Sequence, residues 1–132
     1  MESVVDSETL IALLWKQVEL KTRLPDDYTD FFAQHGPTRG RYSSRRLFHR
    51  FHFRVKAILD RDGILLGVYT KDLSRHGVGL LSPMELCIGD KVRLRLPNGS
   101  NYMLEIVRCA SIDDRCFDCG GRFVRGPRKA SG

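Results

Sequence analysis

The feature that most constrains the fold is a strict alternation of apolar and basic side chains that ends in a turn sequence. In residues 91–96, three aliphatic residues alternate with three basic ones. This period of two is typical of a strand with one buried and one solvated face. Residues 97–100 then read Pro-Asn-Gly-Ser, and Asn-Gly accepts the positive φ angles of a type I′ turn. We therefore predict a strand followed by a tight hairpin, which returns the chain antiparallel to itself.

Other segments of the chain carry similar strand patterns, each bounded by turn-forming residues. The predicted strands are residues 51–60, 64–70, 78–81, 92–96, 102–109 and 117–124. No helical crossover separates them, so neighbours are expected to pair antiparallel. In so small a sheet, closure into a barrel removes the exposed edges. We predict a mainly β fold, a six-stranded antiparallel barrel.

The beginning of the chain has a helical pattern instead. An apolar stripe predicts a helix over residues 7–21, capped by Ser7 or Asp6, and a second helix is predicted over residues 26–34, after Pro25. Two short helices cannot bury their apolar faces alone. We expect this hairpin to bind a protein partner or a second copy of the chain, with docking on the barrel as the alternative.

The stretch between the helices and the barrel is rich in Gly, Pro, Ser and Arg and lacks an apolar period, which is typical of a flexible linker. The predicted organisation is a helical hairpin extension over residues 1–35, a flexible basic linker over 36–44, a barrel domain over 45–125 and a disordered tail over 126–132.

Length and composition limit the class of protein. A chain of 132 residues is long enough for one domain with a real core. Its longest apolar run is far shorter than the ~20 residues that span a bilayer, and its start lacks the features of a signal peptide. We expect a cytoplasmic protein that does not insert into a membrane.

Signals for catalysis or metal binding are weak. The common nucleophile, phosphate-loop and zinc-protease motifs are absent, and the four histidines are dispersed. We expect no enzymatic activity. Cys116 and Cys119 form a C-x-x-C downstream of Cys109, but residues three apart on a strand point to opposite faces. We expect reduced, packed thiols without a metal, and it stays open whether these three cysteines do more than pack.

One stretch concentrates the positive charge. Residues 36–56 carry seven basic residues and no acid, against a net charge of +6 for the whole chain. Arg45, Arg46 and Arg50 lie close together within it. Guanidinium groups fit phosphate oxygens and also stack on purine faces, so this stretch predicts an anion-binding arm.

A turn sequence with complementary chemistry follows the second predicted strand, from Asp72 to Gly77. A carboxylate such as that of Asp72 accepts two hydrogen bonds and matches the N1 and N2 hydrogens of guanine. Ser74 adds a small donor and acceptor. Gly77 is expected to take a positive φ and to let a ligand approach the backbone closely. Arg75 and His76 are secondary candidates for ligand contact.

Taken together, Arg46-x-x-x-Arg50 and Asp72-x-Ser74-x-x-Gly77 resemble the two-part signature of PilZ domains, bacterial receptors for cyclic di-GMP. The resemblance covers residues 43–125. It implies a six-stranded barrel that binds the dinucleotide non-covalently, needs no cofactor and passes the signal on by rearrangement. The ligand-binding residues it implies are Arg46, Arg50, Asp72, Ser74 and Gly77, and Arg45, beside Arg46, is a further candidate.

Other interpretations stay open. A small basic barrel that binds single-stranded nucleic acid is one, because Tyr42, Phe48 and Phe51 lie among the arginines. The charge outside the arm is slightly acidic, however, so we expect nucleic acid not to be the ligand. A ligand-free adaptor that acts through its helices is another. The arginines could also pair with acids such as Asp60, and Asp72 could merely shape a turn.

Overall fold

The computed structural model of the chain describes residues 6–34, 36–37 and 50–124. Its helical elements are α1 (Ser7–Gln17) and a short 3₁₀ helix, η1 (Phe31–Ala33). The strands are β1 (Leu20–Lys21), β2 (Gly36–Pro37), β3 (Phe51–His52), β4 (Lys56–Arg61), β5 (Ile64–Leu73), β6 (Gly77–Ser82), β7 (Lys91–Arg95), β8 (Asn101–Asp113) and β9 (Cys116–Phe123). None of the helices in this part of the chain is long and apolar enough to cross a membrane.

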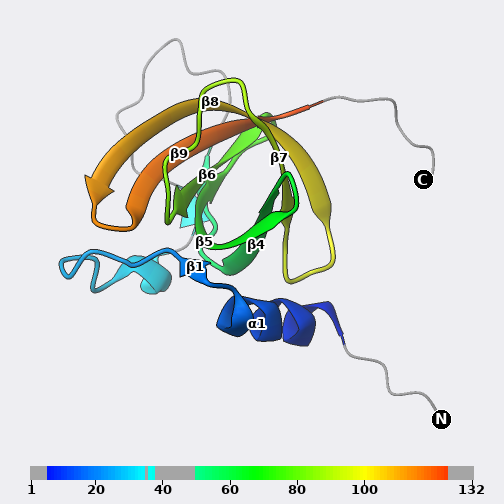
Figure 1. Cartoon of the computed structure of the whole chain (residues 1–132). Helices are drawn as coiled ribbons and strands as arrows, with labels where there is room; N and C mark the ends of the chain where they lie inside the picture. Colours follow the sequence, from blue (N-terminus) through cyan, green and yellow to red (C-terminus); the bar gives the residue numbers. More distant parts are fainter. Residues whose placement is uncertain (1–5, 35, 38–49, 125–132) are drawn as a thin grey trace.

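Six of these strands close into a barrel (Figure 1). Hydrogen-bonded neighbours follow the order β5, β4, β7, β8, β9 and β6, and the pairing of β6 with β5 completes the ring. Every pairing in the ring is antiparallel. The predicted six-stranded antiparallel barrel is confirmed.

Aliphatic side chains that alternate along the strands fill the interior. The buried core consists of Ala57, Leu59, Leu66, Val68, Val78, Leu80, Leu86, Val92, Leu94, Leu96, Leu104, Ile106 and Cys119. Val92 and Leu94, from the alternating stretch, are each only 1% exposed, whereas Lys91 and Arg93 face the solvent. The period of two therefore identified the inward face of this strand correctly.

Several predicted strands have different limits in the structure, and the one predicted over residues 102–109 continues as β8 to Asp113. The strand predicted over residues 51–60 is divided into β3 and β4, because the backbone N–H of Val55 donates to the Thr70 hydroxyl (2.9 Å) instead of joining a regular ladder. The second strand was predicted to end at Thr70 but continues to Leu73. Asp72 consequently lies within β5 and not in a turn.

One hairpin turn differs in type from the prediction. The two-residue hairpin at Asp62 and Gly63 has φ angles of 54° and 90°, both positive, as a type I′ turn requires. In the Pro-Asn-Gly-Ser hairpin only the glycine, Gly99, has a positive φ, and the loop occupies all five residues between Arg95 and Asn101, which pair. The hairpin is confirmed, but type I′ is wrong. Pro97 favours the negative φ of a type I turn at this place.

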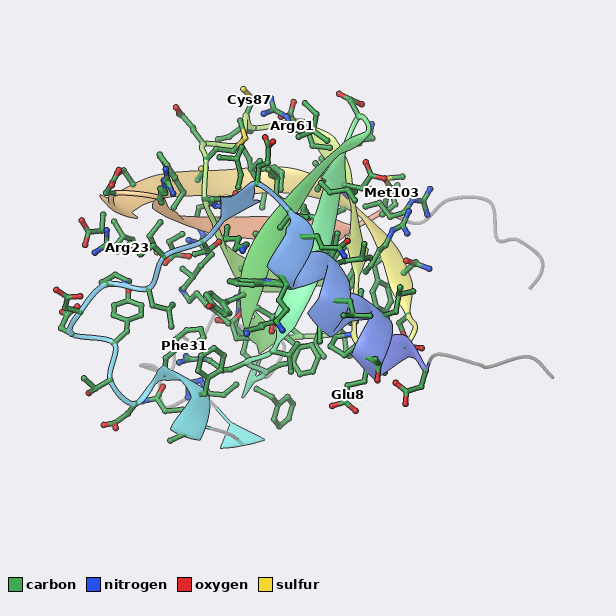
Figure 2. The ribbon with its side chains drawn as sticks, turned by 60° about the horizontal axis from the view of Figure 1, so that its bottom comes forward. Glu8, Arg23, Phe31, Arg61, Cys87 and Met103 are labelled. Atoms are coloured by element: carbon green, nitrogen blue, oxygen red, sulfur yellow. The ribbon has the colours of Figure 1, made fainter. Side chains whose placement is uncertain are left out.

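Helix α1 lies across the outside of β4 and β5 (Figure 2). The Asp6 side chain caps it, accepting a hydrogen bond from the Thr9 amide (2.8 Å). Ile11 and Trp15 are buried against Ile58 of β4. This helix was predicted, although it ends before the predicted limit at residue 21.

The chain after α1 adds a short strand to the barrel. Leu20 and Lys21 form β1, which pairs in parallel with β5. The next residue, Thr22, is 3% exposed, and its hydroxyl lies 2.7 Å from the Leu81 carbonyl and 3.0 Å from the Gly67 carbonyl. Beside β5, β6 pairs with residues 69–73 and β1 with residues 66–67. Thr22 links the backbones of β5 and β6 at the point where the one partner of β5 gives way to the other.

The prediction of a second α-helix over residues 26–34 is wrong. This segment forms turns and the single turn of η1. Asp, Tyr and Thr have low helix propensity, and so short a helix is marginal by itself. Packing decides instead: Phe31 is 4% exposed and clusters with Leu81 and Cys116 on the outer wall of the barrel. Figure 2 shows Phe31 between the segment and the barrel.

The N-terminal extension thus docks on the barrel of its own chain. This was the alternative to a protein partner or a second copy, and binding of either stays a prediction. Gly36 and Pro37, where the linker was predicted to begin, form β2 and pair with β3. Residues 38–44 of the predicted linker and the predicted tail 126–132 lie outside the described residues.

Candidate ligand-binding site

The outer wall of the barrel has paired glycines on two neighbouring strands. Val78 and Leu80 of β6 and Cys119 of β9 belong to the interior cluster. Side chains alternate between the two faces of a strand, so Gly79 and Gly120 belong to the outer wall, where they pair with one another. A patch of this wall therefore has no side chains of its own.

A β-bulge turns Asp72 toward this wall. The register between β5 and β6 shifts between Thr70 and Asp72, so that Asp72 and not Lys71 pairs with Gly79. In an unbroken ladder Asp72 would oppose Val78 and point into the core. An extra residue in one strand reverses the alternation that follows it, and such bulges often re-aim side chains at functional sites.

Arg50 meets the Asp72 carboxylate. Its Nη1 atom lies 3.1 Å from Asp72 Oδ1, and the two side chains are 39% and 16% exposed. The pair joins residues that are 22 positions apart in the sequence. Asp60, the acid considered as an alternative partner, instead lies 3.7 Å from Arg95. The structure therefore brings together one residue from each half of the predicted two-part motif.

Gly79 is a residue of this site that the sequence analysis missed. A Cβ atom on Gly79 would lie 2.9 Å from Asp72 Oδ1. The Asp72 side chain can lie over the sheet only because this position is a glycine. The spacing Gly77-Val78-Gly79 is the signal that could have indicated it, because glycine is uncommon in strand interiors unless another group approaches closely.

Ser74 shapes the turn between β5 and β6. Its Oγ accepts hydrogen bonds from the backbone amides of His76 and Gly77, both at 3.2 Å. The Ser74 amide donates to the Gly77 carbonyl (2.9 Å). This is the turn-forming role that was considered for Ser74 as an alternative to ligand contact. Arg75 and His76 are exposed at the tip of the turn.

Gly77 has a different role from the one predicted. Its φ is not in the positive region, so the expected left-handed turn geometry is wrong. A close approach does exist, but it is to the neighbouring strand: a Cβ atom on Gly77 would lie 2.2 Å from the Gly121 carbonyl oxygen of β9. Gly77 is required so that β6 and β9 can pair at this place, which supports the Ser74 turn and, through it, the site.

Arg54 connects the site to the N-terminal extension. Its guanidinium donates to the Lys71 carbonyl (3.0 Å) and to the Phe31 carbonyl (3.1 Å) and lies 4.2 Å from the centre of the Phe31 ring. Burial lowers the pKa of Arg54, and the Asp72 carboxylate acts in the opposite direction. Arg54 was counted in the basic stretch but was not a predicted site residue.

A cavity of about 350 Å³ lies beside Arg54, between the extension and the barrel. Its lining includes the acidic residues Asp27 and Asp30 together with Arg54 and Lys71. The acids would repel an anionic ligand. The cavity is therefore a poorer candidate for phosphate-containing ligands than the wall around Asp72.

The buried thiols are protonated at neutral pH. Burial, with smaller effects from the Asp118 and Asp113 carboxylates, raises the pKa of Cys116 to about 11. Burial and a hydrogen bond with Cys109 raise the pKa of Cys119 even more. Protonated thiols are poor nucleophiles and poor metal ligands. Among the described residues, no group of three His, Cys, Asp or Glu is placed to hold a metal ion.

The described residues thus bring Arg50, Asp72 and the Ser74–Gly77 turn to one edge of the barrel. The predicted ligand residues Arg45 and Arg46 lie outside the described residues. Comparison with protein families gives a match to the model described as PilZ domain over residues 44–131. The chain belongs to the PilZ domain family. A comparison with curated proteins gives no match.

PilZ domains are the cyclic di-GMP receptor domain family, and they are generally non-enzymatic. The match includes the barrel and both halves of the motif, from Arg46-x-x-x-Arg50 to Gly77. The resemblance inferred from the motif is therefore confirmed at the level of the family. Residues 6–34 of this PilZ protein lie outside the matched region.

Proposed function

We propose that this PilZ protein is a non-enzymatic receptor that binds cyclic di-GMP on the outer wall of its barrel. Arg50, together with Arg45 and Arg46, binds phosphate and guanine, and the Asp72 carboxylate accepts hydrogen bonds from the N1 and N2 atoms of guanine. Ser74 and Gly77 hold the turn that follows Asp72, and Arg75 and His76 lie near enough in the chain to add contacts. No cofactor is required.

The observation that carries this proposal is the contact between Arg50 and Asp72. The two halves of the motif are separated by β3 and β4 in the chain, yet their side chains meet at 3.1 Å and remain partly exposed. A guanidinium beside a carboxylate can accept a ligand that has both an anionic phosphate and a hydrogen-bond donor edge. A guanine nucleotide has both.

The direct test is titration calorimetry of the full chain with cyclic di-GMP at low and high salt. We expect saturable binding that changes little with salt, because the ligand carries only two phosphates and is also bound through its bases. A random single-stranded oligonucleotide serves as the control and should bind weakly.

The nucleic-acid alternative predicts the opposite result. No heat with cyclic di-GMP, combined with oligonucleotide binding that weakens steeply with salt, would favour a nucleic-acid-binding barrel, because counterion release dominates such binding. Absence of binding to either ligand would favour the adaptor.

We further propose that the nucleotide orders the arginine arm against the barrel and changes how the N-terminal extension contacts the barrel or a partner. A chain of contacts from Arg50 to the N-terminal extension supports this. Arg50 directly precedes β3, β3 pairs with both β5 and β2, and Arg54 binds the Phe31 carbonyl. A shift of β3 would therefore act on the extension at two points.

Amide hydrogen exchange tests this second step. On addition of cyclic di-GMP, exchange is expected to slow across residues 38–52 and to change in residues 28–37, because the backbone there gains or loses partners. Strand β7, on another side of the barrel, is the internal control and should not change. Unaltered exchange in both segments at saturating ligand would contradict the proposed rearrangement while leaving binding itself intact.

A further inference from the structure

A second β-bulge brings another arginine to the outer wall. The register between β8 and β9 shifts between Ile106 and Arg108, so that Arg108 pairs with Gly120. Ile106 belongs to the interior cluster. In an unbroken ladder Val107 would take the outward position opposite Gly120, and Arg108 would point into the barrel. The bulge at Val107 therefore has the same effect on Arg108 as the bulge in β5 has on Asp72.

Asp72 and Arg108, the two residues that the bulges turn outward, lie at opposite ends of one row of paired residues. Asp72 pairs with Gly79, Gly79 with Gly120, and Gly120 with Arg108. The row crosses β5, β6, β9 and β8, which lie side by side in Figure 1. At roughly 4.8 Å between neighbouring strands, the backbones of Asp72 and Arg108 are about 14 Å apart. Each side chain reaches back over the adjacent glycine, Asp72 over Gly79 and Arg108 over Gly120, so the carboxylate and the guanidinium lie above two paired positions of the row.

The Arg108 guanidinium lies over the sheet because Gly120 has no side chain. Its Nε, Nη2 and Cζ atoms would be 3.2, 3.2 and 3.4 Å from a Cβ atom on Gly120. Asp118 holds it from the side, with Oδ1 accepting from Arg108 Nη1 at 3.1 Å. Lys71 binds the other oxygen of Asp118 at 2.8 Å. The Arg108 side chain is still 47% exposed, so it remains accessible to a ligand.

We propose that Arg108 is a further ligand-binding residue of this site, a planar platform on which the guanine of cyclic di-GMP stacks while its N1 and N2 edge meets Asp72. The inference rests on the proposed function. It adds a residue that belongs to neither half of the motif. A guanidinium is flat, weakly hydrated and suited to stacking on aromatic faces. The row therefore supplies both contacts that a guanine needs, one for its edge and one for its face.

Two substitutions of Arg108 test the platform, with cyclic di-GMP titrated into each full-length variant. Arg108→Ala is expected to weaken binding about tenfold, the typical loss when a stacking side chain is removed. Arg108→Lys is expected to weaken it nearly as much, because lysine keeps the charge but has no plane. The matched control is Arg93→Ala, which removes an exposed arginine from the outside of β7 and should leave affinity unchanged.

Asp118 is the positioning residue in this arrangement. Asp118→Asn should weaken binding severalfold, and adding it to Arg108→Ala should cost nothing further, since both changes act through the same guanidinium. Additive losses would contradict this coupling. Wild-type affinity in Arg108→Lys would show a contact of charge alone and overturn the platform. An Arg108→Ala affinity within twofold of a wild type that binds would overturn the inference but not the proposed function. No binding by the wild type would overturn both.

Discussion

Replacing Gly77 by alanine is expected to lower the free energy of unfolding by about 3 kcal/mol or more, the upper range for overpacking in a rigid environment. The added Cβ would lie 2.2 Å from the Gly121 carbonyl oxygen and 3.1 Å from the Arg122 Cα atom. Both are backbone atoms of β9, so no side chain can move aside, and β6 and β9 must separate. Urea unfolding followed by circular dichroism measures the loss of free energy. Thermal unfolding should show a fall in Tm of about 10 °C.

Gly120→Ala is the matched control for this prediction. The nearest atoms to its Cβ would be those of the Arg108 guanidinium, at 3.2 Å, the end of a long side chain that can shift, so the stability should change by less than about 1 kcal/mol. Equal stability of Gly77→Ala and wild type would show that the backbones of β6 and β9 are farther apart at Gly77 than this contact requires. Gly77 would then be free for the ligand role that the motif implies.

Replacing Asp72 by alanine is expected to weaken cyclic di-GMP binding about a hundredfold, because it removes an ionised acceptor of two hydrogen bonds from a partly buried position. Folding should be nearly unaffected. The pair that Asp72 forms with Arg50 is at the surface, with the arginine 39% exposed, and such pairs contribute about 1 kcal/mol or less. Calorimetric titration gives the affinity, and thermal unfolding checks the fold.

Asp60→Ala is the control for the loss of a surface carboxylate, because Asp60 pairs with Arg95 on a different part of the barrel. It should bind as the wild type does. Asp72→Asn separates charge from shape: the amide keeps one acceptor but offers donors to a guanine edge that is itself a donor, so binding should remain weak. Retention of full affinity by Asp72→Ala would remove Asp72 from the proposed site and leave the arginines as its only contacts.

The barrel could be predicted from the sequence because strand and turn patterns involve residues that are close together in the chain. The alternation in residues 91–96 and the turn sequences between strands depend only on near neighbours, and the buried positions of Val92 and Leu94 follow from the same period. The second helix could not be predicted in this way. Phe31 is buried by contacts with Leu81 and Cys116, which are distant in the chain, and those contacts outweigh weak helical propensity.

The motif residues that we propose as ligand contacts of this PilZ protein could be named from the sequence alone, because the arginines, Asp72 and their spacing are read directly from the chain. The directions in which Asp72 and Arg108 point follow from the fold and not from the sequence pattern. By regular alternation Asp72 and Arg108 would both point into the core, and a bulge in each strand turns them onto one glycine row. Bulges arise from how two strands fit against each other, so no pattern within a single strand reveals them.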